Sequence, residues 1–469
     1  MMNADEAIVL EAARRNINQT HPEYQRMLPQ WVFFLDAYEG GFTFSTKPGY
    51  LFSHARETAE DRAFRLRRVV YYNYCRSIID IYTSYIYRRE IVRESDHPLF
   101  ASLLSDIDLR GTDIHTFMAS RVAPMAQVFG VVFVVVDMPP APEGLKTAYE
   151  ERALNIRPYA RLLLPFNLVD WELDGNGQFL WVKIKEAAPS LRSPLDDYTP
   201  TRWNYRIWTR QRWFLLDEDG NFLNPNGHKG EPHPVGRVPV ISVFNERSFI
   251  NTLAGVSALQ DIAPICQKIY NLASLLDEFL YKQCFSFLAW PGDVDVERLS
   301  SANVASLDPE TRLLPTYISP PTDPARFIES QIDKNIEEIY RLARIRFAVA
   351  DRRVESGIAR AIAFHDTNNI LAKKARNFEQ AEREIVATMF GWLGEEADFR
   401  IVYPREFSIR AANEEIEEAV KVMRLNLSGA LNARLAKRLV QRVLPALSRE
   451  EQRRIESEID ANFTQPSKQ

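Results

Sequence analysis

The histidines of this sequence, which could bind a metal or act in catalysis, do not have the spacing that either role requires. Seven histidines are scattered along the chain at His21, His54, His97, His115, His228, His233 and His365. Only His228 and His233 stand close together, in a loop rich in Gly and Pro. No cysteine or patterned carboxylate accompanies them, as a zinc site would require. We therefore expect no metal site here.

Two further pairs of residues contain groups that could act in catalysis, but their positions argue against a catalytic role. His365 and Asp366 are neighbours in a predicted helix, where adjacent side chains diverge by about 100° and cannot form a dyad. Glu414 and Glu418 share a helix face, but they open a predicted surface helix, where the dipole favours acids. A surface or packing role is the better interpretation of all four.

The sequence contains no phosphate-binding G-x-x-x-x-G-K-[ST] loop, no G-x-G-x-x-G, no G-x-S-x-G elbow and no H-E-x-x-H. We expect a non-enzymatic protein with no cofactor. A metal-dependent hydrolase with an unfamiliar site is the alternative from another class, and a convergent carboxylate cluster would favour it.

Composition bounds the class of protein. The 469 residues are 46% hydrophobic and 26% charged, which indicates a globular chain of two or more domains. A net charge of −5 gives no general attraction to nucleic acid. Three distant cysteines, Cys75, Cys266 and Cys284, fit a reducing compartment and are interpreted as small buried hydrophobic residues. The start of the chain has no features of a secretory signal, and the apolar run Val131 to Val136 is too short for a membrane span.

Periodicity predicts an α+β body up to about residue 246. The predicted helices are Leu28 to Gly41, Glu60 to Arg89 and Thr112 to Gly130, the last kinked at Pro124. The predicted strands are Val131 to Val136, Tyr159 to Glu172, Phe179 to Lys185, Arg206 to Leu216 and Val238 to Phe244. Five tryptophans of this region are predicted to pack in the core and on sheet faces: Trp171, Trp181, Trp203, Trp208 and Trp213.

After residue 246 the sequence predicts long helices on both sides of a small strand-and-turn module, called here the excursion. A striped helical region at 257–284 leads into a strand-and-turn module at 285–324, and a second helix follows at 325–346. After a loop at 347–355, Ser356 can cap a third helix that reaches about Trp392. A separate helical subdomain is predicted at 414–425, 429–444 and 450–461.

Two basic stretches allow two interpretations each. Eight arginines lie between Arg62 and Arg93, and nine bases face three acids between Arg341 and Arg376. Ion pairs within the chain or to a neighbouring subunit are favoured for the first stretch, and pairing between subunits for the second. Contact with phosphates is the alternative, and loose contact that ignores base sequence suits a moving DNA.

In order and layout the chain resembles the portal family of tailed bacteriophages. WVFFLDAYEGG followed by YLFSHARETAEDRAFRLRRVVYYNYCRSIIDIYTSYIY is similar to the opening of one portal branch. The two long helices around an excursion resemble the portal stem and clip. VESGIARAIAFHDTNNILAKKARNFEQAEREIV is similar to the segment after the portal tunnel loop.

The resemblance implies a division of the chain. The implied parts are a wing at 1–250 and 356–408, a stem at 251–284 and 325–346, a clip at 285–324, a tunnel loop at 347–355 and a crown at 409–469. The clip is short for the family. Copies would form a ring, usually of twelve, at one vertex of the capsid, after assembly in the host cytoplasm.

The resemblance also implies partners and sites. The partners are double-stranded DNA passing without sequence specificity, the terminase large subunit, a head-completion or adaptor protein, and the major capsid and scaffolding proteins. Implied DNA-channel residues of the tunnel loop are Asp351, Arg352, Arg353 and Glu355. Implied stem lumen residues are Lys334, Arg341, Arg344 and Arg346. Implied clip docking residues are Trp290, Asp293, Asp295, Glu297 and Arg298. A scaffold protein that forms no ring is the third interpretation of the chain.

Overall fold

A computed structural model of the chain divides it into two compact units, Met1–Phe407 and Ser408–Gln469. The structure describes residues 11, 14, 16–55, 57–139, 156–188, 201–224, 230–250, 253–283, 287–291, 303–307, 316–318, 322–345, 357–407, 419–425, 427–443 and 449–464. Only the backbone is described at 282–283, 287–291, 303–307, 316–318, 357–363, 441–443, 449–450 and 464.

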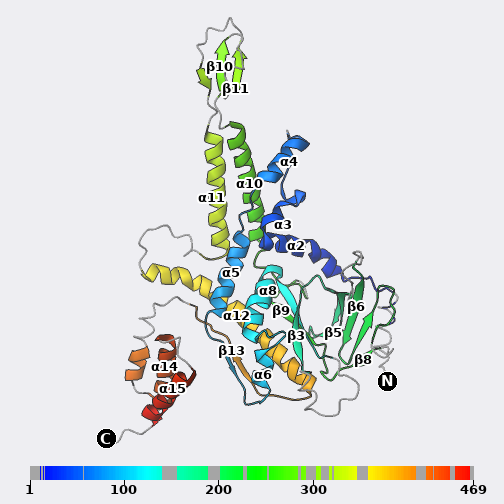
Figure 1. Cartoon of the computed structure of the whole chain (residues 1–469), viewed down its shortest axis with the longest axis vertical. Helices are drawn as coiled ribbons and strands as arrows, with labels where there is room; N and C mark the ends of the chain where they lie inside the picture. Colours follow the sequence, from blue (N-terminus) through cyan, green and yellow to red (C-terminus); the bar gives the residue numbers. More distant parts are fainter. Residues whose placement is uncertain are drawn as a thin grey trace. The chain divides into compact units, whose positions relative to one another are not determined.

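The first unit begins with a series of helices (Figure 1). They are α2 (Pro22–Glu39), α3 (Gly41–Ser45), the 3-10 turn η1 (Pro48–Tyr50), α4 (Ala59–Arg68), α5 (Tyr74–Tyr87) and α6 (Phe100–Ser105). Helix α2 begins earlier than the predicted Leu28, because His21 accepts a hydrogen bond from the Glu23 amide and Pro22 suits the first turn. It ends at Gly40, whose φ is 64°.

The single helix predicted from Glu60 to Arg89 is wrong. The chain is extended between α4 and α5, where the Tyr71 hydroxyl donates to a carbonyl of α2, Ala37 O, at 3.0 Å. The Asn73 side chain caps the start of α5. A second bond to α2, from the Asn73 side-chain amide to Tyr38 O at 2.8 Å, holds the extended stretch, in which Tyr72 is 51% exposed.

The helix predicted from Thr112 to Gly130 forms with a change of winding in the middle. It consists of α7 (Ile114–Phe117), the π-helical turn η2 (Met118–Val122) and α8 (Ala123–Phe129). The π-turn ends two residues before Pro124, which removes one helical donor. Gly130, at a φ of 87°, ends the helix as predicted.

Two antiparallel sheets follow. The first has the order β3-β2-β9 and the second the order β4-β5-β6-β7-β8. The strands are β2 (Val131–Asp137), β3 (Tyr159–Leu163), β4 (Leu168–Leu173), β5 (Phe179–Ala187), β6 (Trp203–Thr209), β7 (Arg212–Leu216), β8 (Glu231–Pro232) and β9 (Val240–Phe244).

Two stretches predicted as continuous strands each form two strands instead. The first passes from one sheet to the other as β3 and β4, and the second is the hairpin of β6 and β7. The run Tyr159 to Glu172 is broken by a turn in which the Asn167 amide donates to Leu164 O at 3.0 Å. The run Arg206 to Leu216 is broken after Thr209, whose hydroxyl accepts from the Arg212 amide at 3.1 Å. Neither turn contains the Gly or Asn-Gly pair that marks tight hairpins in a sequence, so both were missed.

Strand β2 is buried on both faces, as its β-branched run predicted. Val131, Phe133 and Val135 pack with residues of the second sheet, among them Trp171 and Trp208. The alternate residues of β2 pack against helices. The unit is therefore layered, with helices on one side of the first sheet and the second sheet on the other.

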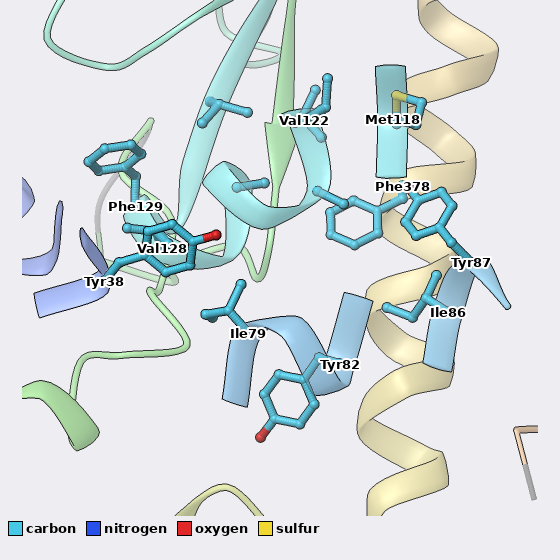
Figure 2. Packing of buried hydrophobic residues seen from close by; sticks show 14 of the residues in the cluster. Tyr38, Ile79, Tyr82, Ile86, Tyr87, Met118, Val122, Val128, Phe129 and Phe378 are labelled. Carbon is cyan, nitrogen blue, oxygen red and sulfur yellow. The ribbon is translucent and has the colours of Figure 1, made fainter. Parts of the chain in front are cut away.

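A long helix, α12 (Gly357–Leu393), packs across β2 and β9. Figure 2 shows Phe378 of α12 close to Met118 and to Ile86 and Tyr87 of α5. After α12, the short strand β13 (Arg400–Val402) pairs antiparallel with β1 (Val92–Glu94). The start and end of α12 match the prediction from Ser356 and Trp392.

The remaining helices of the first unit are α10 (Ile262–Gln283) and α11 (Asp323–Leu342). In the sequence they flank β10 (Phe287–Pro291), β11 (Asn303–Leu307) and β12 (Thr316–Ile318). Helix α11 was predicted to reach Arg346 and stops earlier. Arg344 has a φ of 53°, and the Ile345 amide donates back to Tyr340 O at 3.0 Å, which closes the helix with a left-handed residue.

The second unit contains α14 (Gly429–Val443) and α15 (Arg449–Thr464), which pack on each other. Lys437 forms an ion pair with Asp460 at 2.6 Å. A Cβ on Gly429 would lie 2.4 Å from Phe463 O, so the contact at this end of α14 requires glycine. Of the helix predicted at 414–425, residues 419–424 are helical and 414–418 lie outside the described residues. Within the described residues, no helix has both the length and the apolar character needed to cross a membrane.

We predict that Gly130→Ala is much more destabilising than Gly111→Ala. Both glycines have positive φ, 87° and 82°, which costs an L-residue about 1–2 kcal/mol. A Cβ on Gly130 would also lie 2.4 Å from Gly255 O, whereas Gly111 faces open space. Urea unfolding should show a loss of more than about 3 kcal/mol for Gly130→Ala and about 1–2 kcal/mol for Gly111→Ala. Equal losses would contradict this account of the Gly130–Gly255 contact.

Candidate functional site

Helices α10 and α11 form a pair that leaves large apolar side chains exposed to solvent. This pair is called here the two-helix arm. The two helices lie side by side (Figure 1). Near the body the arm is anchored in the main core through Cys266, Ile269 and Tyr270 of α10 and Ile339 of α11. Ile339 is the one buried residue of α11.

Toward the excursion the arm leaves large apolar side chains uncovered. Leu280 is 51% exposed, Tyr281 49% and Phe327 66%. Helix α11 packs Ile332, Ile336 and Ile339 against the core on one side, while its charged residues lie mainly on the other positions. An amphipathic helix pair with exposed apolar residues at one end is a surface suited to a further protein contact.

Helix α4 braces the outer half of α10 with buried charge. Arg65 is 3% exposed and donates to Ser274 Oγ at 3.0 Å and to Glu57 Oε1 at 2.6 Å. Its Nε also lies 3.6 Å from a carboxylate oxygen of Glu278. A buried guanidinium is stable only when its donors are satisfied in this way.

A second arginine of α4 completes the brace at the surface. Arg68 donates twice to Asp277, at 2.9 and 3.1 Å, and lies over the Tyr281 ring at 4.5 Å from its centroid. The two acids of α10 are therefore neutralised within the chain. The favoured interpretation of the first arginine stretch, ion pairs to neighbours, is confirmed for Arg65 and Arg68 and also for Arg93, which binds Glu382 through two bonds.

Helix α11 keeps an excess of acidic side chains. Its sequence holds five carboxylates and three cations, and Glu329, Asp333 and Glu337 are exposed. Such a surface repels DNA, and its sparse cations allow only weak, local attraction to phosphates.

The stem cations predicted from the sequence fall into different settings. Lys334 is exposed on α11. Arg341 forms two hydrogen bonds to Glu338, at 2.6 and 2.5 Å, and this pairing raises the pKa of Arg341 and lowers that of Glu338. Arg344 is exposed just past the helix, and its carbonyl accepts a bond from the Thr367 hydroxyl. Arg346 lies outside the described residues.

The other predicted site residues are mostly beyond what the structure describes. Trp290 lies on β10, of which only the backbone is described, while the other four clip residues and the whole predicted tunnel loop lie outside the described residues. The backbone of the excursion forms a sheet in which β10 pairs parallel with β11 and antiparallel with β12.

In the second basic stretch, between Arg341 and Arg376, some of the cations form ion pairs within the chain. Arg341 pairs with Glu338, and Lys373 Nζ lies 2.5 Å from Glu246. Arg376 is exposed. Arg346, Arg352, Arg353 and Arg360 have no described side chain, so neither interpretation of the stretch is decided by the described bonds.

The catalytic interpretations rejected from the sequence find no support in the described geometry. His365 and Asp366 are both exposed on α12, as the surface interpretation predicts. His233 is buried, with Nε2 3.0 Å from Thr209 O, while His228 and Glu414 to Glu418 lie outside the described residues. Across the part of the chain that the structure describes, no three His, Cys, Asp or Glu side chains gather as metal ligands would.

Sequence reasoning missed the buried Lys374. Its ammonium donates to Asn245 Oδ1 and lies 4.9 Å from the centroid of the Tyr82 ring, and burial lowers its pKa to about 7. The signal was present, because Leu371, Ala375 and Phe378 place Lys374 on the apolar side of α12. It was counted with its exposed neighbour Lys373 as a phosphate-binding candidate, which its burial excludes in this structure.

Comparisons with known proteins identify no family. The sequence matches no family model and no curated protein sequence. Among solved structures it is similar to a chain of "Neck of empty GTA particle computed with C6 symmetry", with 12% identity and a TM-score of 0.42, over 82% of this chain and 89% of that chain. A score of this size does not establish a common fold, and no function is carried over from it.

We predict that Arg65→Met destabilises the first unit strongly and that Arg67→Met does not. Removing Arg65 leaves the carboxylates of Glu57 and Glu278 without their buried cation, which costs about 3–5 kcal/mol. Arg67 is an exposed residue of the same helix, and its substitution should stay within about 0.5 kcal/mol. Urea unfolding followed by circular dichroism measures both. A loss below about 1 kcal/mol for Arg65→Met would contradict the brace.

Lys374 gives a prediction for pH. Its pKa is about 7 in the folded chain and 10.5 in the absence of burial, so between these values the unfolded chain binds one more proton. Stability should therefore rise with pH across this window, by up to about 1.4 kcal/mol per pH unit.

The test compares the slope of unfolding free energy between pH 7 and pH 10 in Lys374→Met and in the matched variant Lys373→Met. Lys374→Met should lose this contribution to the slope, whereas Lys373→Met, whose side chain is 59% exposed, should keep it. Equal slopes in the two variants would show that Lys374 is not buried in its neutral form above pH 7.

Proposed function

We propose that this chain is the portal subunit of a tailed bacteriophage. Copies assemble into a ring, usually of twelve, at one capsid vertex, and DNA enters and leaves the head through the central channel. The observation that carries the proposal is the two-helix arm, which is anchored at its base and leaves apolar side chains uncovered toward an excursion of about 40 residues. The order of sequence segments that resemble the portal wing, stem, clip, tunnel loop and crown supports it.

In a ring, the exposed apolar side chains of each two-helix arm can be covered by a neighbouring subunit. Repeated around an axis, each arm can pack its uncovered apolar side chains, Leu280 and Phe327 among them, on the next copy. The exposed acids of α11, Glu329, Asp333 and Glu337, then remain for a polar lining. DNA inside an acidic channel is held away from the wall, and sparse cations such as Lys334 guide it without arresting it.

The proposal assigns the energy of packaging to another protein. The sequence has no nucleotide-binding motif, so ATP hydrolysis belongs to the terminase large subunit, which docks at the clip, 285–324. A head-completion or adaptor protein replaces it there after packaging. Trp290, Asp293, Asp295, Glu297 and Arg298 are the proposed docking residues. The finished ring belongs to the virion, in contact with the major capsid and, during assembly, scaffolding proteins.

The direct test of this function is DNA packaging in particles that lack the chain. Heads assembled without it should contain no nuclease-protected DNA, and supplying the chain in trans should restore protection. Normal packaging in its absence would refute the conduit role and return weight to a scaffold protein or to an enzyme.

The tunnel loop provides a residue-level prediction. We expect Arg352→Ala combined with Arg353→Ala to lower the amount of nuclease-protected DNA several-fold while the ring still assembles, because the two guanidiniums are the proposed nearest contacts to phosphate. Arg67→Ala is the control, since it removes an exposed arginine from α4, far from the loop in sequence. Unchanged packaging in intact rings would remove Arg352 and Arg353 from the channel lining.

A further inference from the structure

Two cysteines that are 191 positions apart in the sequence meet at the base of the two-helix arm. The Sγ atoms of Cys75, in the first turn of α5, and Cys266, in the second turn of α10, lie 3.5 Å apart. Both are free thiols, 0% and 1% exposed. The sequence predicted both as buried hydrophobic residues, and their burial confirms that prediction. Their contact was not foreseen.

The surroundings hold the two thiols against each other. The Tyr71 hydroxyl lies 3.6 Å from Cys75 Sγ and is fixed by its bond to Ala37 O at 3.0 Å. Apolar residues of the main core enclose the pair, among them Ile78, Ile269 and Tyr270. A disulfide has its sulfurs about 2.05 Å apart, so closure requires an approach of roughly 1.5 Å between side chains that already touch.

We propose that Cys75 and Cys266 form a latent disulfide, reduced when the chain is made and closed when the protein meets an oxidant. Closure links the first turn of α5 to the base of α10 and so ties the arm to the body by a covalent bond. The modification concerns a single chain and goes beyond the proposed portal function.

The chemistry explains why the pair stays reduced until then. The hydrogen bond with the Cys75 thiol, together with burial, raises the pKa of Cys266, which keeps that thiol protonated and poorly nucleophilic at neutral pH. Oxidation therefore needs a transient opening of the core and an oxidant small enough to enter. With a diazene oxidant such as diamide, one thiol adds across the N=N bond. The second sulfur then attacks the first, the S–S bond forms as the S–N bond breaks, and the hydrazine leaves with both hydrogens.

The link would stabilise the folded chain because it constrains the unfolded one. The closed loop spans nearly half of the first unit, and the entropy removed from the unfolded chain grows with loop length. We expect Tm to rise on the order of 5 °C after closure, with reversal by dithiothreitol.

The experiment uses the full-length chain with Cys284→Ser, which leaves Cys75 and Cys266 as the two thiols. The folded protein is incubated with diamide, alkylated and digested without reduction. The expected product is a peptide pair linked through Cys75 and Cys266, with the intact mass of one chain less two hydrogens and the higher Tm. The matched control, Cys266→Ala with Cys284→Ser, should give neither the linked pair nor the rise in Tm.

Free thiols that persist in the folded protein, under conditions in which the urea-unfolded protein is fully oxidised, would overturn the proposal. Links between chains in place of the internal link would also overturn it. Because the readout is internal to one chain, it does not depend on ring formation, and a failure of the ring proposal would leave this inference unchanged.

Discussion

The apolar residues of α10 and α11 are only partly covered by the pairing of the two helices, so the rest of their apolar surface needs another partner. In this chain the constraint is met at the base, where Cys266, Ile269 and Tyr270 of α10 and Ile339 of α11 enter the main core. Farther out, α4 supports α10 through the ion pairs of Arg65 and Arg68 and through the contact of Phe64 with Tyr281. Beyond this brace, Leu280, Tyr281 and Phe327 stay partly uncovered. Much of what we propose for the protein follows from this uncovered end of the arm.

The distribution of charge fits the same view. Arg65 and Arg68 of α4 are occupied by Glu57, Asp277 and Glu278, so these two arginines hold the fold together and are not free for nucleic acid. The acids of α11 exceed its cations, and of the predicted stem cations Arg341 already pairs with Glu338. A basic sequence window is thus a poor guide to nucleic-acid contact until the partners of each side chain are known.

Local signals in the sequence predicted the elements that depend on local physics. Gly130 ends its helix, the β-branched run Val131 to Val136 is a strand buried on both faces, and α12 begins next to Ser356. The α+β class follows from these elements and is confirmed. The break between α4 and α5 was missed because it depends on the bond from Tyr71 to Ala37, which no local pattern contains.

The candidate site was less predictable than the fold for the same reason. Periodicity placed the two helices of the arm, but the contact of Cys75 with Cys266 joins residues 191 positions apart, and the burial of Lys374 depends on Asn245 and Tyr82. Their chemistry arises from tertiary neighbours, which spacing along one helix does not reveal. The resemblance to portals supplied the roles of Arg352, Arg353 and the clip residues, and these roles stay predictions.

The most direct test of the central claim is the mass and shape of the purified full-length chain, by native mass spectrometry with negative-stain electron microscopy. The account predicts rings with a central hole and a mass near twelve times the 54.1 kDa of one chain, or a ring of one more subunit. A monomer or dimer that persists at micromolar concentration, also with the scaffolding protein present, would contradict it.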